Sequence, residues 1–440
     1  MSRELVYLLV LISTLCVLGC SKQEPRSTHP TEPIASSEPE TTETNPWVIQ
    51  TTSDIDPGWM NELLDGAHAS HTDALVVLHR GEQVFAWPAP DKQTPIEMMS
   101  ATKPFVALAV GLLVEQGKLD VNAPVSSFFV EWEGDPRGSI TIEHLLHHTS
   151  GLVSPTPTMP IYESGDFLRF ALDSQLEALP GETFRYNNNG VNLLAGIVEE
   201  VSGESIADLL ERELFSPMQI TDFTWARDAA GNTHGMSGLA LRASDAAKIG
   251  QLFLDRGEWR GEQLIPASWI DYMLTPSARM TEMGALIWRT DIADSYTLDD
   301  ALLQEWATWG VSKETIEVFE PVRNKQFASP RDFFDAVRAI LANNPNARRE
   351  FTEHIEKPNR PFFTATNKRL GLIHHQGNVG QYMIAIPTRD IVVIRQLVET
   401  AELQRETFEE KNLTYTFQEI FPLCIKLAAS RPNSPANPGE

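Results

Sequence analysis

The sequence predicts an α/β fold of the α+β kind, in which one antiparallel sheet is completed by both ends of the folded part. Short apolar runs at residues 74–79 and 83–87 are separated by a turn and predict a hairpin near the start. β-rich runs at residues 381–387 and 391–397 predict a second hairpin near the end. Between the two hairpins, apolar residues recur at helical spacing, which predicts an inserted helical region.

Several segments carry the periodicity and the end signals of helices. Ser202-Gly203 separates two of these segments, and Ser244 is the expected N-cap of another. A Thr-Ser-Gly turn at residues 149–151 follows a third. The expected helices cover residues 59–70, 100–117, 141–148, 191–201, 205–215, 244–257 and 403–429.

Length, charge and cysteine content narrow the class of protein. The chain has 440 residues, enough for one large domain, and a formal net charge of -25. Nucleic-acid binding requires a basic surface, so this charge argues against such a partner. The three cysteines are Cys16, Cys20 and Cys424. Cys424 lies in an apolar stretch and is expected to be a buried free thiol.

The N-terminus has the features of a targeting segment. Residues 5–19 are apolar but shorter than the roughly 20 residues that a spanning helix needs, and Arg3 supplies a positive start. Gly19-Cys20 at the end of the run resembles a bacterial lipoprotein cleavage box. We therefore expect residues 1–19 to be a signal peptide and Cys20 to carry a lipid. The alternative is an ordinary signal peptide with a chance cysteine.

Residues 20–46 are rich in Ser, Thr, Pro and Glu and lack apolar periodicity, which is typical of a disordered tether. The expected folded domain covers residues 47–430, followed by a disordered tail at 431–440. These features predict an exported protein, held at the cell envelope by its lipid. Ser21 follows the cysteine, and by resemblance to lipoproteins this favours the periplasmic face of the outer membrane in a Gram-negative source.

Ser100 and Lys103 form an S-x-x-K motif at the start of the 100–117 helix. Residues three apart share a helix face, so the lysine amine can reach the serine hydroxyl. A serine needs an adjacent base to become a nucleophile, and a buried lysine can serve as that base. The positive end of the helix dipole favours negative charge developing at Ser100. The alternative is a capping serine beside a solvated lysine.

A second motif, Y-x-N, occurs at Tyr186 and Asn188, on a loop that leads into a helix. Tyr186 is positioned to relay protons with the lysine, and the Asn188 amide to hold the lysine and a substrate carbonyl. The alternative is a turn with a packed tyrosine.

A third motif, H-x-G, occurs at His375 and Gly377, just before the C-terminal hairpin. The backbone N–H of Asn378 at this strand edge could lie opposite the N–H of Ser100, and two such donors make an oxyanion hole. His79-Arg80-Gly81 matches the same pattern, but it precedes the serine in an ordinary hairpin turn.

Together and in this order, the three motifs resemble the three boxes of the serine β-lactamase-related family. That family includes class C β-lactamases, D-alanyl-D-alanine carboxypeptidases, D-aminopeptidases and related esterases. Flanking segments at residues 140–152, 180–203 and 238–265 also resemble it. The resemblance implies a β-lactamase/transpeptidase-like fold, with a central antiparallel sheet flanked by helices plus a helical subdomain.

The resemblance also implies an acyl-enzyme mechanism without a cofactor. The implied catalytic residues are Ser100, Lys103 and Tyr186, and the implied substrate- or oxyanion-binding residues are Asn188, His375, Gly377 and Asn378.

The sequence departs from the family in two places. His375 stands where class C β-lactamases usually carry lysine, and an imidazole would hold a β-lactam carboxylate less firmly than an ammonium. This favours a peptidase or esterase over a dedicated β-lactamase. Residues 291–369 exceed what the family needs and predict an insertion, either a lid over the pocket or, as we favour, packed decoration. Its aromatic residues include Trp306, Trp309, Phe319, Phe333 and Phe334.

A zinc site is a weaker alternative. His144 and His148 are four residues apart beside Glu143, a spacing that can chelate zinc, and His374 adjoins His375. No H-E-x-x-H motif accompanies them, so the sequence predicts no metal.

The leading hypothesis is a serine hydrolase that acts on a small-molecule or peptide ester or amide, of the D-alanyl peptide, ester or β-lactam class. The alternative is a catalytically idle, penicillin-binding-type sensor. The sequence leaves the substrate and the oligomeric state open.

Overall fold

The computed structural model describes residues 55–357, 360–398 and 419–430. The expected signal peptide, Cys20, the tether and the 431–440 tail lie outside the described residues, as does the first part of the 403–429 helix. None of the helices in the described part of the chain combines the length and the apolar character that crossing a membrane requires.

The described residues divide into two compact units, one formed by residues 295–366 and the other by the chain on either side of them. The larger unit contains helices α2 (Pro57–Ala69), α3 (Lys103–Glu115), α4 (Ile142–Leu146), α5 (Met159–Ser164), α6 (Phe167–Leu172), α7 (Asn188–Ser202), α8 (Ile206–Leu210), α9 (Ala243–Leu254), α10 (Ala267–Met273) and α16 (Ile420–Ala429). Its strands are β1 (Ala74–His79), β2 (Glu82–Trp87), β3 (Ile96–Glu97), β4 (Phe223–Trp225), β5 (Leu239–Leu241), β6 (Glu258–Trp259), β7 (Glu262–Gln263), β8 (Trp288–Ile292), β12 (Arg369–Gly377), β13 (Gln381–Ile386) and β14 (Ile391–Gln396).

The central sheet of the larger unit has the strand order β2-β1-β14-β13-β12-β8, and its neighbouring strands are antiparallel. Strand β1 pairs with β14 from Ala74 opposite Gln396 to His79 opposite Ile391. The two predicted hairpins therefore lie side by side in one sheet. This confirms the prediction that both ends of the folded part complete it.

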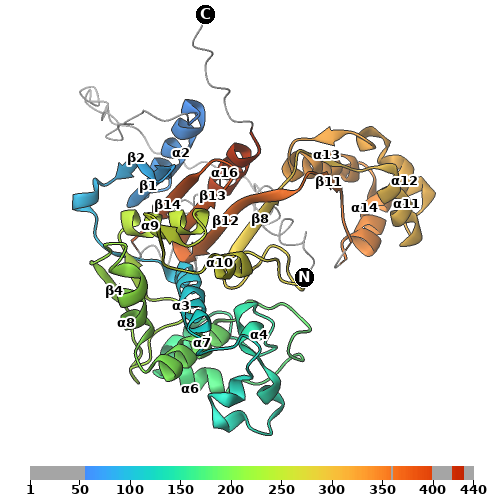
Figure 1. The fold of residues 1–440 in the computed structure, drawn as a ribbon. Helices are drawn as coiled ribbons and strands as arrows, with labels where there is room; N and C mark the ends of the chain where they lie inside the picture. The colour runs from blue at the N-terminus through green and yellow to red at the C-terminus, as the bar shows by residue number, and fades with distance from the viewer. Residues whose placement is uncertain (1–54, 358–359, 399–418, 431–440) are drawn as a thin grey trace, which may run out of the picture. The chain divides into compact units, whose positions relative to one another are not determined.

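Helices cover both faces of this sheet (Figure 1). Helix α9 packs on β14, β13 and β1, while α16 packs on β12 and against α2. The Trp59 indole on α2 donates to the Leu423 carbonyl of α16 at 3.0 Å. Since both faces are covered, β13 and β14 are buried along their whole length.

A helical region lies between the two hairpins in the chain, as expected. Helix α3 packs against α7, and α7 also contacts α4, α6 and α8. Helix α7 ends at Ser202 with Gly203 in the left-handed conformation, as the Ser-Gly break predicted. The prediction for Ser244 was wrong. Arg242 occupies the N-cap of α9, and the Ser244 N–H is satisfied by the Gln93 side chain at 2.9 Å instead of by a local cap.

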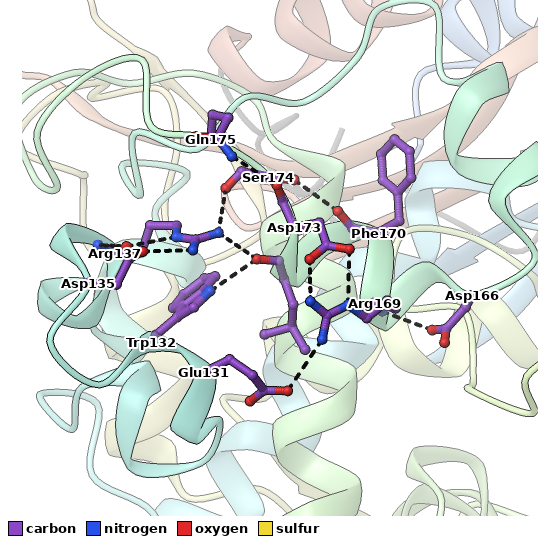
Figure 2. Close-up of polar contacts among 11 residues, drawn as sticks. Glu131, Trp132, Asp135, Arg137, Asp166, Arg169, Phe170, Asp173, Ser174 and Gln175 are labelled. Carbon is purple, nitrogen blue, oxygen red and sulfur yellow. Dashed lines mark hydrogen bonds and ion pairs between the residues drawn. The ribbon is translucent and has the colours of Figure 1, made fainter.

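A polar cluster fastens the helical region together (Figure 2). The Trp132 indole and the Arg137 guanidinium both donate to the Leu172 carbonyl at the end of α6, at 3.1 and 2.7 Å. Arg137 also donates to the Ser174 carbonyl at 3.1 Å. The Ser174 hydroxyl accepts from the Asn189 amide at 2.8 Å. The cluster thus fixes the first turn of α7, directly after Tyr186.

The smaller unit, residues 295–366, lies within the predicted insertion at 291–369. The Trp306 ring meets those of Phe319 and Phe351 at 5.2 and 5.7 Å, and Phe333 meets Phe334 at 5.4 Å. These aromatic side chains therefore form a core inside the unit. Its elements are β9 (Ser295–Thr297), α11 (Asp300–Thr308), α12 (Lys313–Val318), β10 (Gln326–Phe327), α13 (Pro330–Ala342), α14 (Pro345–Glu350) and β11 (Thr364–Thr366).

Candidate active site

Ser100 lies in a 3-10 turn, Met99–Thr102, that leads into α3. The sequence predicted an α-helix over residues 100–117, but the α-helix begins at Lys103. A 3-10 turn has about three residues per turn, so side chains at i and i+3 lie directly in line. The Lys103 Nζ accordingly donates to the Ser100 Oγ at 3.0 Å. The motif spacing therefore brings amine and hydroxyl together, although by a tighter helix than expected.

The backbone just before the nucleophile is strained. Met99 has φ 50°, a left-handed conformation that is uncommon for a residue with a side chain. The preceding residue is anchored, because the Met98 N–H donates to the Leu239 carbonyl of β5 at 2.8 Å. The surrounding structure thus holds Met99, directly before Ser100, in a conformation that the local chain does not favour.

The Lys103 amine is fully buried and has no acidic partner among its hydrogen bonds. Besides Ser100, it donates to the Met236 carbonyl at 2.8 Å, so both acceptors are neutral. Burial lowers the pKa of Lys103 well below the ordinary lysine value. A neutral amine bonded to a serine hydroxyl can accept its proton, which is the role that the sequence predicted.

The Met236 carbonyl is itself held in place from α7. The Asn192 Oδ1 accepts hydrogen bonds from the N–H groups of Gly235 and Met236, both at 3.1 Å. Sequence reasoning missed both Met236 and Asn192. A backbone carbonyl leaves no trace in the sequence, but a polar Asn192 within an apolar helix was a usable signal.

Tyr186 completes the contact set around the nucleophile. The Lys103 Nζ lies 4.9 Å from its ring centroid. Burial raises the pKa of Tyr186, and the interaction with the Ser100 side chain offsets part of this rise. Tyr186 therefore remains a neutral hydroxyl that can donate one proton while it accepts another.

His148, considered from the sequence only as a possible zinc ligand with His144, forms one wall of the site. Its ring lies 4.6 Å from the Tyr186 ring, and its Nδ1 accepts from the Asn187 N–H at 3.1 Å. On another side, Trp288 stacks with Tyr186 at 6.4 Å and 11°. Burial, and then the nearby Lys103, lower the pKa of His148 to about 3, so the imidazole is neutral. His148 and Trp288 thus restrict the position of the Tyr186 ring.

Asn188 is the first residue of α7. Its N–H donates to the Ser154 hydroxyl at 3.1 Å, while Asn187 caps the helix by accepting from the Gly190 N–H at 2.8 Å. The hydrogen bonds of Lys103 in this structure go to the Ser100 hydroxyl and the Met236 carbonyl, and not to the Asn188 amide that the sequence suggested.

His375 and Gly377 lie at the end of β12. His375 is 1% exposed, and its Nδ1 lies 2.9 Å from the Gln376 carbonyl oxygen. Burial, followed by the proximity of Lys103, lowers the pKa of His375 well below the ordinary histidine value. The imidazole is therefore neutral and does not supply the positive charge of an ammonium at this position.

Gly377 at the end of β12 lies against the segment that precedes Ser100. A Cβ placed on Gly377 would lie 2.3 Å from the Met98 carbonyl oxygen, so only glycine fits. Asn378 follows directly, as the first residue of the 3-10 turn Asn378–Gly380. The approach at Gly377 therefore brings this turn to the backbone that precedes Ser100.

The histidines considered for zinc have other roles. The His144 Nδ1 accepts from the Thr141 N–H at 3.2 Å in a capping box, and the His374 Nε2 lies 3.0 Å from the Thr290 hydroxyl. Within residues 55–357, 360–398 and 419–430, no group of three or more His, Cys, Asp or Glu side chains is arranged to hold a metal ion.

Residues 60–397 match the Beta-lactamase protein family. The chain belongs to this family. Penicillin-binding protein 4* of Bacillus subtilis is 36% identical over 132 residues, which are 28% of this chain and 28% of the relative. The 6-aminohexanoate-dimer hydrolase of Paenarthrobacter ureafaciens is 26% identical over 238 residues, 48% of this chain and 60% of the relative. Each match thus spans less than two thirds of the relative's own length.

Solved structures share the fold. The octameric penicillin-binding protein homologue from Pyrococcus abyssi superimposes with a TM-score of 0.50 at 18% identity, over 83% of this chain and 79% of that chain. At this identity the likeness shows the fold alone. It confirms the predicted β-lactamase-like architecture of sheet and helices.

The lowered pKa of Lys103 predicts the pH dependence of this site. Only the neutral amine can accept the Ser100 proton, so kcat/KM for an ester should rise with pH through the pKa of Lys103 and then level off. Because burial lowers that pKa, the plateau should begin well below the ordinary lysine value of 10.5. A pH–rate profile measures the pH at which the plateau begins. Tyr186→Phe is the control, which should lower the height of the plateau but leave the midpoint of the rising limb at the same pH. A limb centred near 10.5 would contradict a neutral Lys103.

The close approach at Gly377 predicts that Gly377→Ala disables the site. The added methyl group must push β12 away from Met98, and a displacement of about 1 Å at reacting groups can cost roughly 100-fold in rate. Steady-state ester hydrolysis measures the loss. Gly117→Ala is the control, because Gly117 also tolerates no side chain easily at φ 65° but has nothing within 4 Å. Similar activity of the two variants would show that the contact is unimportant.

Proposed function

We propose that this protein is a serine hydrolase that cleaves an ester or amide through an acyl-enzyme on Ser100. The observation that carries the proposal is the 3.0 Å hydrogen bond from the buried Lys103 Nζ to the Ser100 Oγ. Because both acceptors of the Lys103 amine are neutral, the amine stays unprotonated and can act as a base. The Ser100 hydroxyl, a potential nucleophile, is bonded to it and can give it a proton.

In the acylation step, the Ser100 Oγ attacks the substrate carbonyl carbon while its proton passes to the Lys103 Nζ. The carbonyl oxygen becomes an oxyanion, which the backbone N–H groups of Ser100 and Asn378 stabilise. Collapse of the tetrahedral intermediate breaks the bond to the alkoxide or amine leaving group. The proton held by Lys103 reaches that group through the Tyr186 hydroxyl, which donates its own proton and accepts another.

In the deacylation step, water attacks the acyl carbon and gives its proton to the same Lys103–Tyr186 pair. The second tetrahedral intermediate uses the same two backbone donors. The Ser100–acyl bond then breaks, Ser100 regains its proton, and the acyl group leaves as a carboxylic acid. No cofactor is needed, since the proton that Ser100 loses departs with the leaving group and the attacking water supplies the proton that restores Ser100.

The proposed substrate is an ester or amide that needs no cationic partner for a carboxylate. His375 is neutral and 1% exposed, at the position where the family's class C enzymes usually carry lysine. A neutral imidazole attracts a carboxylate much less than an ammonium does. This supports a peptidase or esterase over a dedicated β-lactamase. Amide cleavage is separately supported by a relative named for hydrolysis of the 6-aminohexanoate dimer.

Covalent labelling tests the nucleophile. A fluorescent fluorophosphonate should label the wild-type protein at Ser100, and Ser100→Ala should abolish both the label and the hydrolysis of p-nitrophenyl esters. Lys103→Met should slow labelling by at least about 100-fold, because general-base catalysis contributes roughly 10²–10⁴-fold. Ser150→Ala, which alters a buried serine elsewhere in the larger unit, is the control and should label normally. Continued labelling of Ser100→Ala at the same peptide would overturn the assignment.

We further propose that the enzyme works at the cell envelope, anchored by a lipid on Cys20. The supporting observation is the short apolar run that ends in Gly19-Cys20, followed by a tether-like composition. In a bacterial host fed labelled palmitate, the full chain should incorporate label and sediment with membranes. Cys20→Ser should lose both properties, whereas Cys16→Ser should keep them. Equal labelling of Cys20→Ser and wild type would contradict the anchor.

A further inference from the structure

Strand β14 ends in two fully buried polar residues, Arg395 and Gln396, that the mechanism above does not use. Burying a guanidinium costs free energy unless its donors are hydrogen bonded. The partners of the Arg395 donors therefore show what the residue holds in place. Consecutive residues of a strand point to opposite faces of the sheet. The two side chains therefore reach different neighbours from one point of the backbone.

Arg395 ties the turn that carries Asn378 to the body of the sheet. Its Nη1 donates to the Gly380 carbonyl at 2.7 Å, and Gly380 is the last residue of that turn. Its Nη2 donates to the Ser70 carbonyl at 2.6 Å, and its Nε to the Thr72 hydroxyl at 2.9 Å. One rigid guanidinium thus connects the turn to the chain that follows α2.

The residue after the turn is held from the same strand end. The Gln381 Nε2 donates to the Leu397 carbonyl at 2.6 Å, and the Leu397 N–H donates back to the Gln381 Oε1 at 2.9 Å. The backbone of residues 380 and 381 is therefore anchored to the end of β14 and to Leu397 just beyond it.

Gln396 anchors the other half of the oxyanion hole. Its Nε2 lies within hydrogen-bond distance of the Met98 Sδ and the Leu241 carbonyl, both at 3.0 Å. Met98 precedes the strained Met99 and the nucleophile Ser100, and its carbonyl is the atom that Gly377 approaches. The amide thus fixes the start of the segment that presents the Ser100 N–H.

We propose that Arg395 and Gln396 are positioning residues that set the spacing between the two oxyanion donors, the N–H groups of Asn378 and Ser100. Both anchors are consecutive residues of one central strand, so their separation is fixed by a single backbone step of about 3.3 Å. This inference rests on the proposed function. Oxyanion stabilisation depends on donor position, and losing one donor costs about 10²–10³-fold in kcat.

The test is Arg395→Met in the full chain, with three measurements. The kcat for a p-nitrophenyl ester should fall at least about tenfold with KM changed less than about threefold, because the donors act on the tetrahedral state. Affinity for a boronic acid, which forms a tetrahedral adduct with Ser100, should fall by a similar factor. Amide hydrogen exchange in the peptide covering residues 376–381 should become faster.

Arg389→Met is the matched control. Arg389 lies in the turn at the other end of the same hairpin, where its Nε donates to the Leu427 carbonyl at 2.9 Å. This variant also removes an arginine that donates to backbone carbonyls, but at the opposite end of strands β13 and β14 from the turn. Its kcat, boronate affinity and exchange at 376–381 should match the wild type.

An Arg395→Met protein that keeps wild-type kcat and wild-type exchange overturns the proposal, and so does a lower kcat with unchanged boronate affinity. If this variant does not fold, Thr72→Val decides by the direction of the same three changes, because it removes the hydroxyl that accepts from the Arg395 Nε and that also lies 3.5 Å from the Ser70 hydroxyl. Failure of the proposed function is distinguishable. If the wild type turns over no ester or amide, the exchange data still show whether Arg395 holds the turn.

Discussion

The burial of one amine constrains the rest of this site. Lys103 begins a helix that is buried from Lys103 to Leu113, and its ammonium form would have no carboxylate among its hydrogen-bond partners. The fold therefore keeps the amine neutral. Burial, the largest cause in each case, also lowers the pKa of the His148 and His375 imidazoles, so that both are neutral. Burying these polar groups in uncharged form costs folding free energy, which the apolar core must offset.

The geometry of the site also depends on the pairing of strands from the two ends of the folded part. The nucleophile follows the first hairpin, while the turn bearing Asn378 joins β12 to the second hairpin, nearly three hundred residues later. Pairing of β1 with β14 makes these distant segments neighbours. Contacts at Gly377 and Gln396 then bring the turn and the nucleophile segment together at Met98. The geometry of the site therefore depends on the register of the sheet, because a slip by one residue would displace the turn bearing Asn378 relative to the segment that carries Ser100.

Much of this arrangement could be predicted from the sequence. Alternating and apolar runs located the hairpins, and the motif spacing placed Lys103 within reach of Ser100. Other features could not be foreseen. The 3-10 turn at Ser100 reflects tertiary anchoring of a strained Met99, which local propensity does not encode. Met236 acts through a backbone carbonyl, which any residue type supplies. The place of His148 beside Tyr186 could not be foreseen, because this contact joins segments 38 positions apart.

The ends of the smaller unit lie together. Ser295 pairs with Thr366 across β9 and β11, and their hydroxyls are 2.9 Å apart, while Asp294 and Asn367 hydrogen bond at 2.9 Å on the other side of the junction. A segment whose entry and exit coincide can be gained or lost without stretching the chain on either side. Residues 295–366 therefore have the geometry of an inserted domain. A fold of this family could acquire such a domain in a single insertion event, and the sequence of that domain could then change independently of the catalytic residues.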